Sequence, residues 1–236
     1  MRVLVVGAGA VGKALFSVIK EHHKAKLIDK VSLVGGSFDV MHICFPYGLD
    51  FIEEVTKYIV RFNPGLTIIE STVPVGTTRE IWLSLNQLHD IVHSPVRGSH
   101  DELVEGIRFY DKCIGAFDTD TLIRAYRYYE DMGLYPRMFC GPEETEFSKL
   151  ANLSYFAVQI AFFQEIERKA KKLGVELFDV HHFFKSAGRD RPVRTGGVIG
   201  GSCVMQGFNK LFPQGDDFSW LSRWVNYSNE ARKQEV

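Results

Sequence analysis

The sequence predicts an α/β fold, in which a doubly wound parallel sheet is followed by an all-α domain with one long helix. Short β-branched runs alternate with helical periodicity in the first part of the chain, and a glycine-rich loop joins the first run to the first helix. The alternation stops at Gly141 and Pro142. We therefore expect one α/β domain over residues 1–140 and a helical domain over residues 141–236.

The elements of the first domain follow from its apolar runs. Expected strands lie at 2–6, 25–28, 40–45, 66–70, 91–93, 112–116 and 135–139, and expected helices at 11–20, 51–62, 78–88 and 119–132. Strands that alternate with helices of about ten to fifteen residues are typical of βαβ units. The strands should therefore form a parallel sheet.

A single long helix is predicted after Gly141. Pro142 suits its first position, acidic residues follow, basic residues precede the other end, and Gly174 is a natural stop. Its middle, residues 150–166, is apolar on almost every face, which indicates burial on several sides. We therefore expect a homodimer, with residues 141–236 as a central or dimerisation domain.

The composition excludes several classes of function. The formal charge is −1 and the basic residues are scattered, so we expect no nucleic-acid partner. No apolar run reaches the roughly 18 residues of a membrane span, and the N-terminus leads directly into a strand, so we expect no membrane partner and a cytoplasmic protein. Its four cysteines form no C-x-x-C pair, which argues against a disulfide framework or structural zinc.

We expect no metal site at the histidines. His89 and His93 straddle the start of an expected strand, and the side chains of the adjacent His181 and His182 point apart. No cysteine or carboxylate completes either pair at ligand spacing.

The glycine-rich loop predicts a dinucleotide site. Gly7-Ala8-Gly9-Ala10-Val11-Gly12 is a G-x-G-x-x-G sequence that follows a strand and opens a helix, and Asp29 ends the next strand. Gly7 permits the tight turn, Gly9 lets backbone amides approach a pyrophosphate, and Gly12 lets the helix pack closely. Asp29 would accept hydrogen bonds from the ribose and repel a 2′-phosphate, so we expect NAD rather than NADP, a preference that Lys30 slightly weakens. A structural turn without a ligand is the alternative.

Three segments resemble a known family in the family's own order. Residues 70–78, Glu-Ser-Thr-Val-Pro-Val-Gly-Thr-Thr, resemble the S-T-V-P-V-G-T segment of the UDP-glucose/GDP-mannose dehydrogenase family. Residues 146–152 are similar to its E-x-x-K-L-x-x-N helix, and residues 200–203 to its G-G-x-C loop. The resemblance runs from residue 1 to about residue 210.

The resemblance implies a two-step oxidation of a sugar-nucleotide alcohol to the acid with two NAD. In the family a cysteine thiolate captures the aldehyde, the thiohemiacetal loses a second hydride, and water hydrolyses the thioester. Cys203 matches the nucleophile, Lys149 the cation that stabilises oxyanion charge, and Thr72 the threonine beside nicotinamide and an ordered water. The expected catalytic residues are Cys203, Lys149, Asn152 and Thr72, and the expected cofactor-binding residues are Gly7, Gly9, Ala10, Val11, Gly12, Asp29, Lys30, Pro46, Ser71 and Thr72.

Helical spacing supports part of this assignment independently. Thr145, Ser148, Lys149, Asn152 and Gln159 fall within one stripe of an otherwise apolar helix, as expected for a helix that lines a polar cavity. A lysine whose head group reaches solvent near the helix start is the alternative. Cys203 lies beside two glycines, in a segment expected to be flexible.

The chain departs from the family at positions that bear on hydrolysis. The family has an asparagine four residues after the lysine, but here that position is Leu153. The asparagine of this chain, Asn152, comes one residue earlier. The Lys-Asp pair expected after Cys203 is Gln206-Gly207, and the glutamate of the family's N-P-E segment is Val96. The chain also ends about where the family's nucleotide-binding third domain would start. These losses affect the hydrolytic step more than the hydride step.

Two other functions stay open. One is a hydroxyacid dehydrogenase of similar architecture, in which Cys203 is incidental. The other is a non-catalytic NAD-binding protein. Two groups of basic residues could bind an anion in place of the third domain. The first is His93, Arg97 and His100, and the second is Arg189, Arg191 and Arg194. A solvated loop is the simpler interpretation of both groups.

Overall fold

The protein is described by a computed structural model that covers residues 1–29, 35–186, 194, 196–200, 202–213, 215 and 219–235. It contains two compact units, Met1–Lys149 and Leu150–Val236. The boundary lies inside one helix, whereas the sequence predicts a domain boundary at residues 140–141, which stays a prediction.

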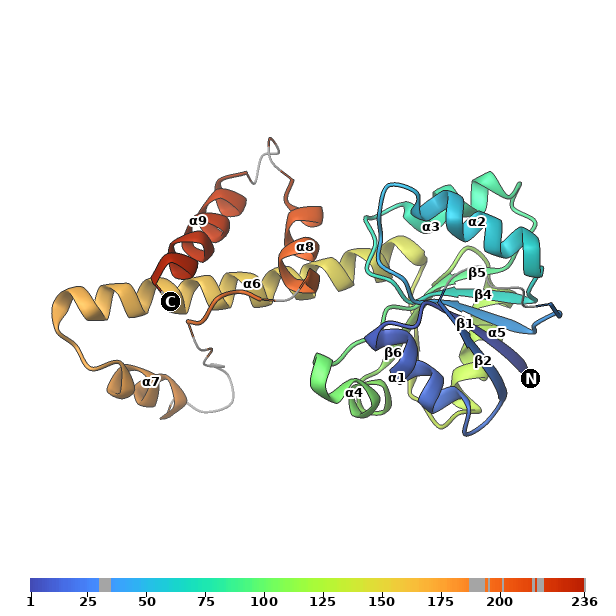
Figure 1. The fold of residues 1–236 in the computed structure, drawn as a ribbon, viewed down its shortest axis with the longest axis horizontal. Coiled ribbons are helices and arrows are strands. Elements are labelled where there is room, and N and C mark those ends of the chain that lie inside the picture. Colours follow the sequence, from blue (N-terminus) through green and yellow to red (C-terminus); the bar gives the residue numbers. More distant parts are fainter. Residues whose placement is uncertain are drawn as a thin grey trace. The chain divides into compact units, whose positions relative to one another are not determined.

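The first unit is built on a sheet with seven strands among the described residues, in the order β2-β1-β3-β4-β5-β6-β7. The strands from β2 to β5 are parallel neighbours, which is the expected doubly wound arrangement (Figure 1). Their bounds are β1 (Arg2–Val6), β2 (Lys24–Ile28), β3 (Val40–Ile43), β4 (Leu66–Ile69), β5 (Ile91–His93), β6 (Lys112–Ala116) and β7 (Pro136–Met138).

Helices cover both faces of this sheet (Figure 1). The helices on one face are α1 (Ala10–Ile19), α4 (Leu103–Phe109) and α5 (Thr119–Glu130). The helices on the other face are α2 (Phe51–Phe62) and α3 (Thr77–Ser84). The central strands are buried on both sides, which explains why their sequences are continuous apolar runs rather than alternating ones.

The direction of β6 differs from the expected parallel arrangement. Strand β6 pairs antiparallel with β5, and β7 is parallel to β6. The segment between β5 and β6 holds the short 3-10 turn His100–Glu102 and the seven-residue helix α4, which packs beside α1. It does not return the chain to the amino edge of the sheet, so β6 begins at the edge where β5 ends. An apolar run marks a strand but carries no information about its direction.

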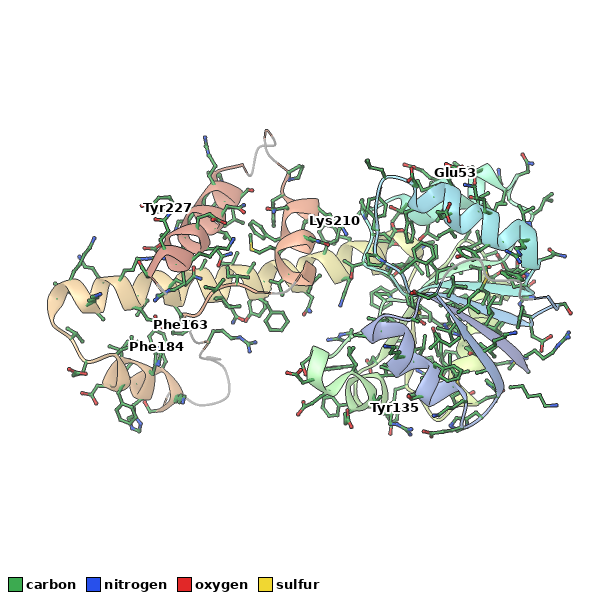
Figure 2. The ribbon with its side chains drawn as sticks, viewed as in Figure 1. Glu53, Tyr135, Phe163, Phe184, Lys210 and Tyr227 are labelled. Atoms are coloured by element: carbon green, nitrogen blue, oxygen red, sulfur yellow. The ribbon has the colours of Figure 1, made fainter. Side chains whose placement is uncertain are left out.

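The second unit is helical. Helix α6 (Pro142–Leu173) confirms the predicted long helix, and the second unit contains its portion from Leu150 onwards, together with α7, α8 and α9. Phe163 of α6 stacks edge-to-face with Phe184, their ring centroids 5.4 Å apart, which fixes α7 on α6 (Figure 2). No helix among the described residues is long and apolar enough to cross a bilayer. The remaining bounds are α7 (Leu177–Ser186), α8 (Ser202–Leu211) and α9 (Ser219–Glu235).

Candidate cofactor and active site

Two glycines of the loop after β1 are required by packing inside the protein. Gly7 has a φ of +107°, and a Cβ there would lie 2.8 Å from the Phe45 backbone nitrogen. A Cβ at Gly12 would lie 1.8 Å from the Gly7 carbonyl oxygen. These glycines let the loop, α1 and the end of β3 approach one another closely.

Gly9 is different, because a Cβ there would meet nothing within 4 Å. It is the N-cap of α1, where no side chain caps the helix and no acidic residue occupies the first turn. The first amides of α1 therefore face open space with a positive electrostatic potential, which is the geometry that binds a phosphate. This end of the helix fits a dinucleotide.

Asp29 lies beside the same loop. It directly follows β2, and one of its carboxylate oxygens accepts a hydrogen bond from the Ala8 amide at 3.1 Å. Strand β1 lies between β2 and β3 in the sheet, so the strand order runs outwards in opposite directions on the two sides of β1. The glycine-rich loop leaves the sheet at this switch point. Dinucleotides bind at this point in open α/β sheets. Lys30, the other charged residue expected here, lies outside the described residues.

The loops after β3 and β4 are joined by Ser71. Its hydroxyl donates to the Phe45 carbonyl at 2.6 Å and lies 3.3 Å from the Ile43 carbonyl. Pro46 is exposed beside this contact and Thr72 is half-buried. The residues expected to meet the cofactor from β3 and β4 thus share the carboxyl edge of the sheet with the glycine loop.

Two of the segments that resemble the family pack against each other through Glu146. Its buried carboxylate accepts hydrogen bonds from the Gly76 amide at 2.6 Å, the Thr78 amide at 2.8 Å and the Thr78 hydroxyl at 2.6 Å. Burial raises the pKa of Glu146 despite these hydrogen bonds. A carboxylate at the start of α3 satisfies its unpaired amides, so Glu146 fixes the start of α6 to the Thr72 loop.

Lys149 is half-buried, and its ammonium donates to the Val96 carbonyl at 2.8 Å. The carbonyl oxygen thus holds the predicted cation at the carboxyl end of β5. Val96 itself is buried where the resemblance leads us to look for a carboxylate.

Thr145 of the predicted polar stripe contacts a buried histidine. The Thr145 hydroxyl lies 2.7 Å from His93 Nδ1, and His93 Nε2 lies 3.2 Å from the Ser71 carbonyl. Burial lowers the pKa of His93 to about 3, so the ring is neutral and its Nε2–H donates to Ser71. Ser148 is exposed, so only part of the stripe lines this interior.

The stripe continues in the second unit. Asn152 is partly buried, and Gln159 accepts a hydrogen bond from Arg194 at 3.3 Å. The Arg194 guanidinium stacks on Phe156 with 4.6 Å between its carbon and the ring centroid. Arg189 and Arg191 lie outside the described residues, as does the side chain of His100.

Two departures from the family lie in direct contact in the second unit. A Cβ at Gly207 would be 2.5 Å from Leu153 Cδ1 and 3.1 Å from Leu153 Cβ. Leu153 is buried. The apolar side chain therefore occupies the space that a residue larger than glycine would need at position 207, and the two changes are physically coupled.

The cysteines fall into different environments. Cys203 lies in the first turn of α8, rather than in the flexible turn expected from its glycine neighbours, and its side chain is outside the described ones. Cys44 is buried after β3, and burial raises the pKa of its thiol. Burial also raises the pKa of Cys113. Cys44 is therefore a buried thiol that packs in the core, and Cys113 is a partly buried thiol within β6.

A buried polar network lies beneath the site, and sequence periodicity gives no sign of it. The Glu70 carboxylate contacts the Lys112 ammonium and accepts hydrogen bonds at 2.9 Å from His42 and at 2.9 Å from Tyr129. Its members come from β3, β6, α5 and the end of β4, so only the fold brings them together.

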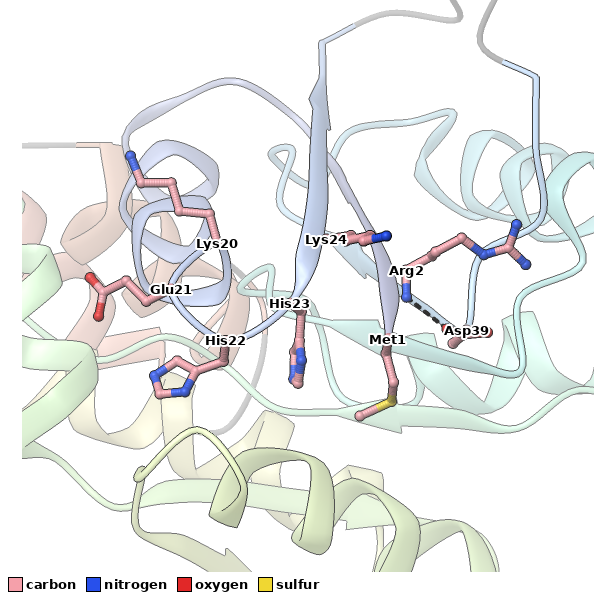
Figure 3. Close-up of a pocket in the computed structure, with 8 residues that line it drawn as sticks. All are labelled: Met1, Arg2, Lys20, Glu21, His22, His23, Lys24 and Asp39. Atoms are coloured by element: carbon pink, nitrogen blue, oxygen red, sulfur yellow. Dashed lines mark hydrogen bonds between the residues drawn. The ribbon is translucent and has the colours of Figure 1, made fainter.

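A surface hollow lies at the opposite edge of the sheet. Met1, Arg2 and Lys24 line it where β1 and β2 begin, and the Arg2 amide donates to Asp39 at 2.6 Å (Figure 3). The glycine loop follows the carboxyl end of β1, so this hollow is not the dinucleotide site.

Comparisons with known proteins agree with this geometry. Residues 143–230 match the central domain of the UDP-glucose/GDP-mannose dehydrogenase family. The chain is 27% identical over 155 residues to a UDP-N-acetyl-D-mannosamine dehydrogenase of Methanocaldococcus jannaschii. The aligned region covers 65% of this chain and 36% of that protein. The chain thus spans about a third of the length of the curated relatives it matches.

Solved structures show the same fold. A UDP-D-ManNAc dehydrogenase from Pyrococcus horikoshii superposes with a TM-score of 0.80 at 20% identity, over 99% of this chain and 68% of that one. A 3-hydroxyisobutyrate dehydrogenase from Mycobacterium tuberculosis superposes with a TM-score of 0.69 at 16% identity, over 99% of this chain and 93% of that one. The resemblance inferred from the sequence is confirmed: residues 143–230 match the central domain of the UDP-glucose/GDP-mannose dehydrogenase family, and a domain with a Rossmann-type fold precedes them in the chain.

Proposed function

We propose that the protein is an NAD-dependent oxidoreductase that oxidises an alcohol group of a sugar nucleotide or a related compound. The observation that carries this proposal is the meeting of three features at one edge of the sheet: the open N-terminus of α1, the Thr72 loop and the ammonium of Lys149. The matched family consists of dehydrogenases, which use a nicotinamide cofactor.

The residues of the first unit divide the binding of NAD among them. The amides around Gly9, Ala10 and Val11 bind the pyrophosphate, and Asp29 binds the ribose hydroxyls and disfavours a 2′-phosphate. Pro46, Ser71 and Thr72 border the nicotinamide end. Bound NAD would supply the hydride acceptor for this oxidation.

Lys149 stabilises negative charge that develops on the substrate oxygen. Its anchoring to the Val96 carbonyl holds the ammonium in place before the substrate arrives, which keeps the reorganisation cost of the step low. Asn152 lies nearly one helical turn further along α6, on the same face. We assign it the second polar contact to the substrate.

We propose that the reaction ends after one oxidation, at the aldehyde. Leu153 and Gly207 pack together where the resemblance implies two polar side chains, and Val96 replaces a carboxylate. A thioester on Cys203 would need an activated water for hydrolysis, and these positions supply no acid or base. We assign to Cys203, in the first turn of α8, the reversible binding of the aldehyde.

A homodimer is the proposed assembly. Tyr155 is 54% exposed and Phe162 is 43% exposed, and their spacing of two helical turns places them on one face of α6. Large aromatic side chains on one helix face are typical of a subunit interface. We further propose a cytoplasmic location, because that compartment keeps a thiol such as Cys203 reduced.

The proposal is tested by measuring NADH production with a panel of UDP-sugars, GDP-sugars, free sugars and hydroxyacids. We expect turnover with a sugar nucleotide, about 100-fold lower in Lys149→Ala and unchanged in the matched control Lys172→Ala at the exposed end of α6. One NADH per substrate consumed indicates one oxidation, and two indicate the complete reaction. An active Lys149→Ala variant contradicts the assigned site, and no turnover with any substrate favours an NAD-binding protein without catalysis.

A hydroxyacid dehydrogenase is the second candidate. The similarity to the 3-hydroxyisobutyrate dehydrogenase structure extends over 93% of that chain, so a Rossmann domain with a helical domain of this size makes a complete fold there. Cys203→Ser separates the two candidates. Unchanged NADH production with a hydroxyacid supports the second candidate, and a change in product or rate with a sugar nucleotide supports the first.

A further inference from the structure

A buried ion pair joins the ends of the two strands that carry the proposed site. Glu70 directly follows β4 and Lys112 begins β6, and both residues are only 3% exposed. The Lys112 ammonium contacts the Glu70 carboxylate and donates to the Ser94 carbonyl at 2.6 Å, just after β5. One ammonium therefore holds the ends of both β4 and β5.

Every hydrogen bond in this network has a consistent donor and acceptor. Burial lowers the pKa of His42, so its neutral ring donates from Nδ1 to Glu70, and Nε2 accepts from the Tyr128 hydroxyl at 2.8 Å. Burial alone would raise the pKa of Glu70, but the Lys112 charge and the His42 hydrogen bond outweigh it, and this pKa lies below its ordinary value. The carboxylate is therefore ionised and fully paired, so it is unsuited to act as a catalytic base.

The two ends held by Lys112 lead into the proposed site. Glu70 stands two residues before Thr72, on the β4 side. Ser94 stands two residues before Val96, whose carbonyl anchors the Lys149 ammonium. The neighbouring His93 donates to the Ser71 carbonyl, which adds a second link between the same two strand ends. A shift of Lys112 would thus move the Thr72 loop relative to the anchor of Lys149.

We propose that Lys112 and Glu70 are positioning residues of the oxidoreductase site, which set the separation of the Thr72 loop from the Lys149 anchor. This inference rests on the proposed function. An ion pair of this kind is costly to bury and is often no more stabilising than an apolar pair of the same shape. Its two directional contacts, to Glu70 and to Ser94, supply a fixed geometry that apolar packing does not.

The experiment uses the double variant Glu70→Gln/Lys112→Met, which leaves no unpaired buried charge. The matched control is Arg124→Met, which removes an ion pair with Asp90 and a contact with the Gly65 carbonyl at the opposite edge of the same sheet. Lys149 reactivity is measured as its rate of acylation by acetic anhydride, relative to the exposed Lys172 of the same helix. The NADH production rate, the KM for NAD and the melting temperature are measured on the same samples.

We expect Lys149 acylation to rise at least 5-fold in the double variant, because its anchor is no longer fixed. We expect kcat to fall at least 10-fold while the KM for NAD changes less than 3-fold. The pyrophosphate and the ribose are assigned to the glycine loop and Asp29, and the hydrogen bonds described for the pair reach neither of them. Arg124→Met should leave both quantities unchanged. A general loss of stability would lower the melting temperature without this separation of kcat from KM.

A folded double variant with wild-type Lys149 acylation and wild-type kcat overturns the inference. If the double variant does not fold, Lys112→Arg, which keeps the charge, takes its place. Wild-type Lys149 acylation together with wild-type kcat in that variant then overturns the inference. The acylation rate needs no substrate, so it distinguishes failure of this inference from failure of the proposed function. If the wild-type protein reduces no NAD and Lys149 still becomes reactive in the variant, the positioning role stands and the proposed reaction is wrong.

Discussion

The sheet unit and the helical unit bury their apolar side chains to very different extents. The sheet carries one apolar cluster on each face, and the helices on both sides close them. The helical unit has a smaller cluster around Ala157, Ala161 and Phe208. Phe178, Trp220 and Tyr227 of the same unit stay 60–78% exposed, and Figure 2 labels Tyr227 on α9.

This difference indicates a division of roles. The sheet unit completes its own core, so its surface positions are free to serve a ligand. The helical unit leaves large aromatic groups uncovered, which is expected of a surface that a second subunit covers. Polar contacts supplement its core, since Arg168 donates to the Ser228 carbonyl at 2.6 Å and Arg232 pairs with Glu167 at 2.7 Å.

The largest expected effect concerns packing within the sheet unit. Gly12→Val should prevent folding or cost more than about 4 kcal/mol, because the new side chain overlaps the Gly7 carbonyl. Gly9→Ala should leave the melting temperature unchanged and weaken NADH binding about tenfold, because its Cβ points to the open space where we propose that the phosphate binds. Thermal unfolding and NADH fluorescence titration measure the two effects. Equal NADH binding by wild type and Gly9→Ala would place the phosphate elsewhere.

The next effect is a pH dependence of the sheet unit. Folding lowers the pKa of His93 from 6.5 to about 3, mainly through burial. Below pH 6.5 the unfolded chain therefore binds a proton that the folded protein does not, so stability present above pH 6.5 is lost as the pH falls towards 3. Between pH 6.5 and 4.5 the loss should be about 2 to 3 kcal/mol.

Urea unfolding of the wild type and His93→Gln across this range measures the contribution of His93. The stability of the variant should depend less steeply on pH. Glu70, Lys112 and Lys149, whose charges also affect the pKa of His93, are unchanged in both proteins. Identical slopes would show that His93 is protonated equally in the folded and unfolded states.

A smaller effect tests the exposed aromatic face of the helical unit. Phe162→Glu should weaken the homodimer about 30-fold, or about 2 kcal/mol, because it places a charge within the proposed interface. Val60→Glu is the control, since Val60 is 64% exposed on α2 of the sheet unit. Light scattering over a dilution series gives the dissociation constants. If the wild type is a monomer, the exposed aromatic side chains of the helical unit do not form a subunit interface.

The sequence predicted local features well and long-range features poorly. Gly7, Gly9 and Gly12 are recognisable because the G-x-G-x-x-G pattern that is typical of phosphate-binding turns fixes both their identity and their spacing. The long helix is recognisable because Pro142 and Gly174 mark its ends. The antiparallel direction of β6 leaves no periodic signal, because either direction uses the same apolar run.

The buried network is the main feature of the site that periodicity could not reveal. Glu70, Lys112 and Tyr129 are separated by at least 17 residues and meet only once the sheet has formed. The only available signal was a pair of charged residues at the ends of apolar runs, a common arrangement on any strand. Leu153 and Gly207 were each recognisable as departures from the family, but their contact required the packing of α8 against α6.

A substitution at the contact between Leu153 and Gly207 should have the smallest effect on stability. It tests whether the packing of the helical unit is as intolerant of a larger side chain as the packing of the sheet unit. Gly207→Asp should cost about 1 to 2 kcal/mol, because its Cβ would lie 2.5 Å from the movable end of Leu153 rather than against backbone. Leu153→Asn in the same chain should recover most of this cost, since the shorter polar side chain vacates the space and can accept or donate a hydrogen bond. Urea unfolding of the four proteins of the double-mutant cycle measures the coupling. Additive effects would mean that the two positions do not share one space. A clear coupling, together with a rise from one towards two NADH per substrate, would link this contact to the proposed absence of a second oxidation.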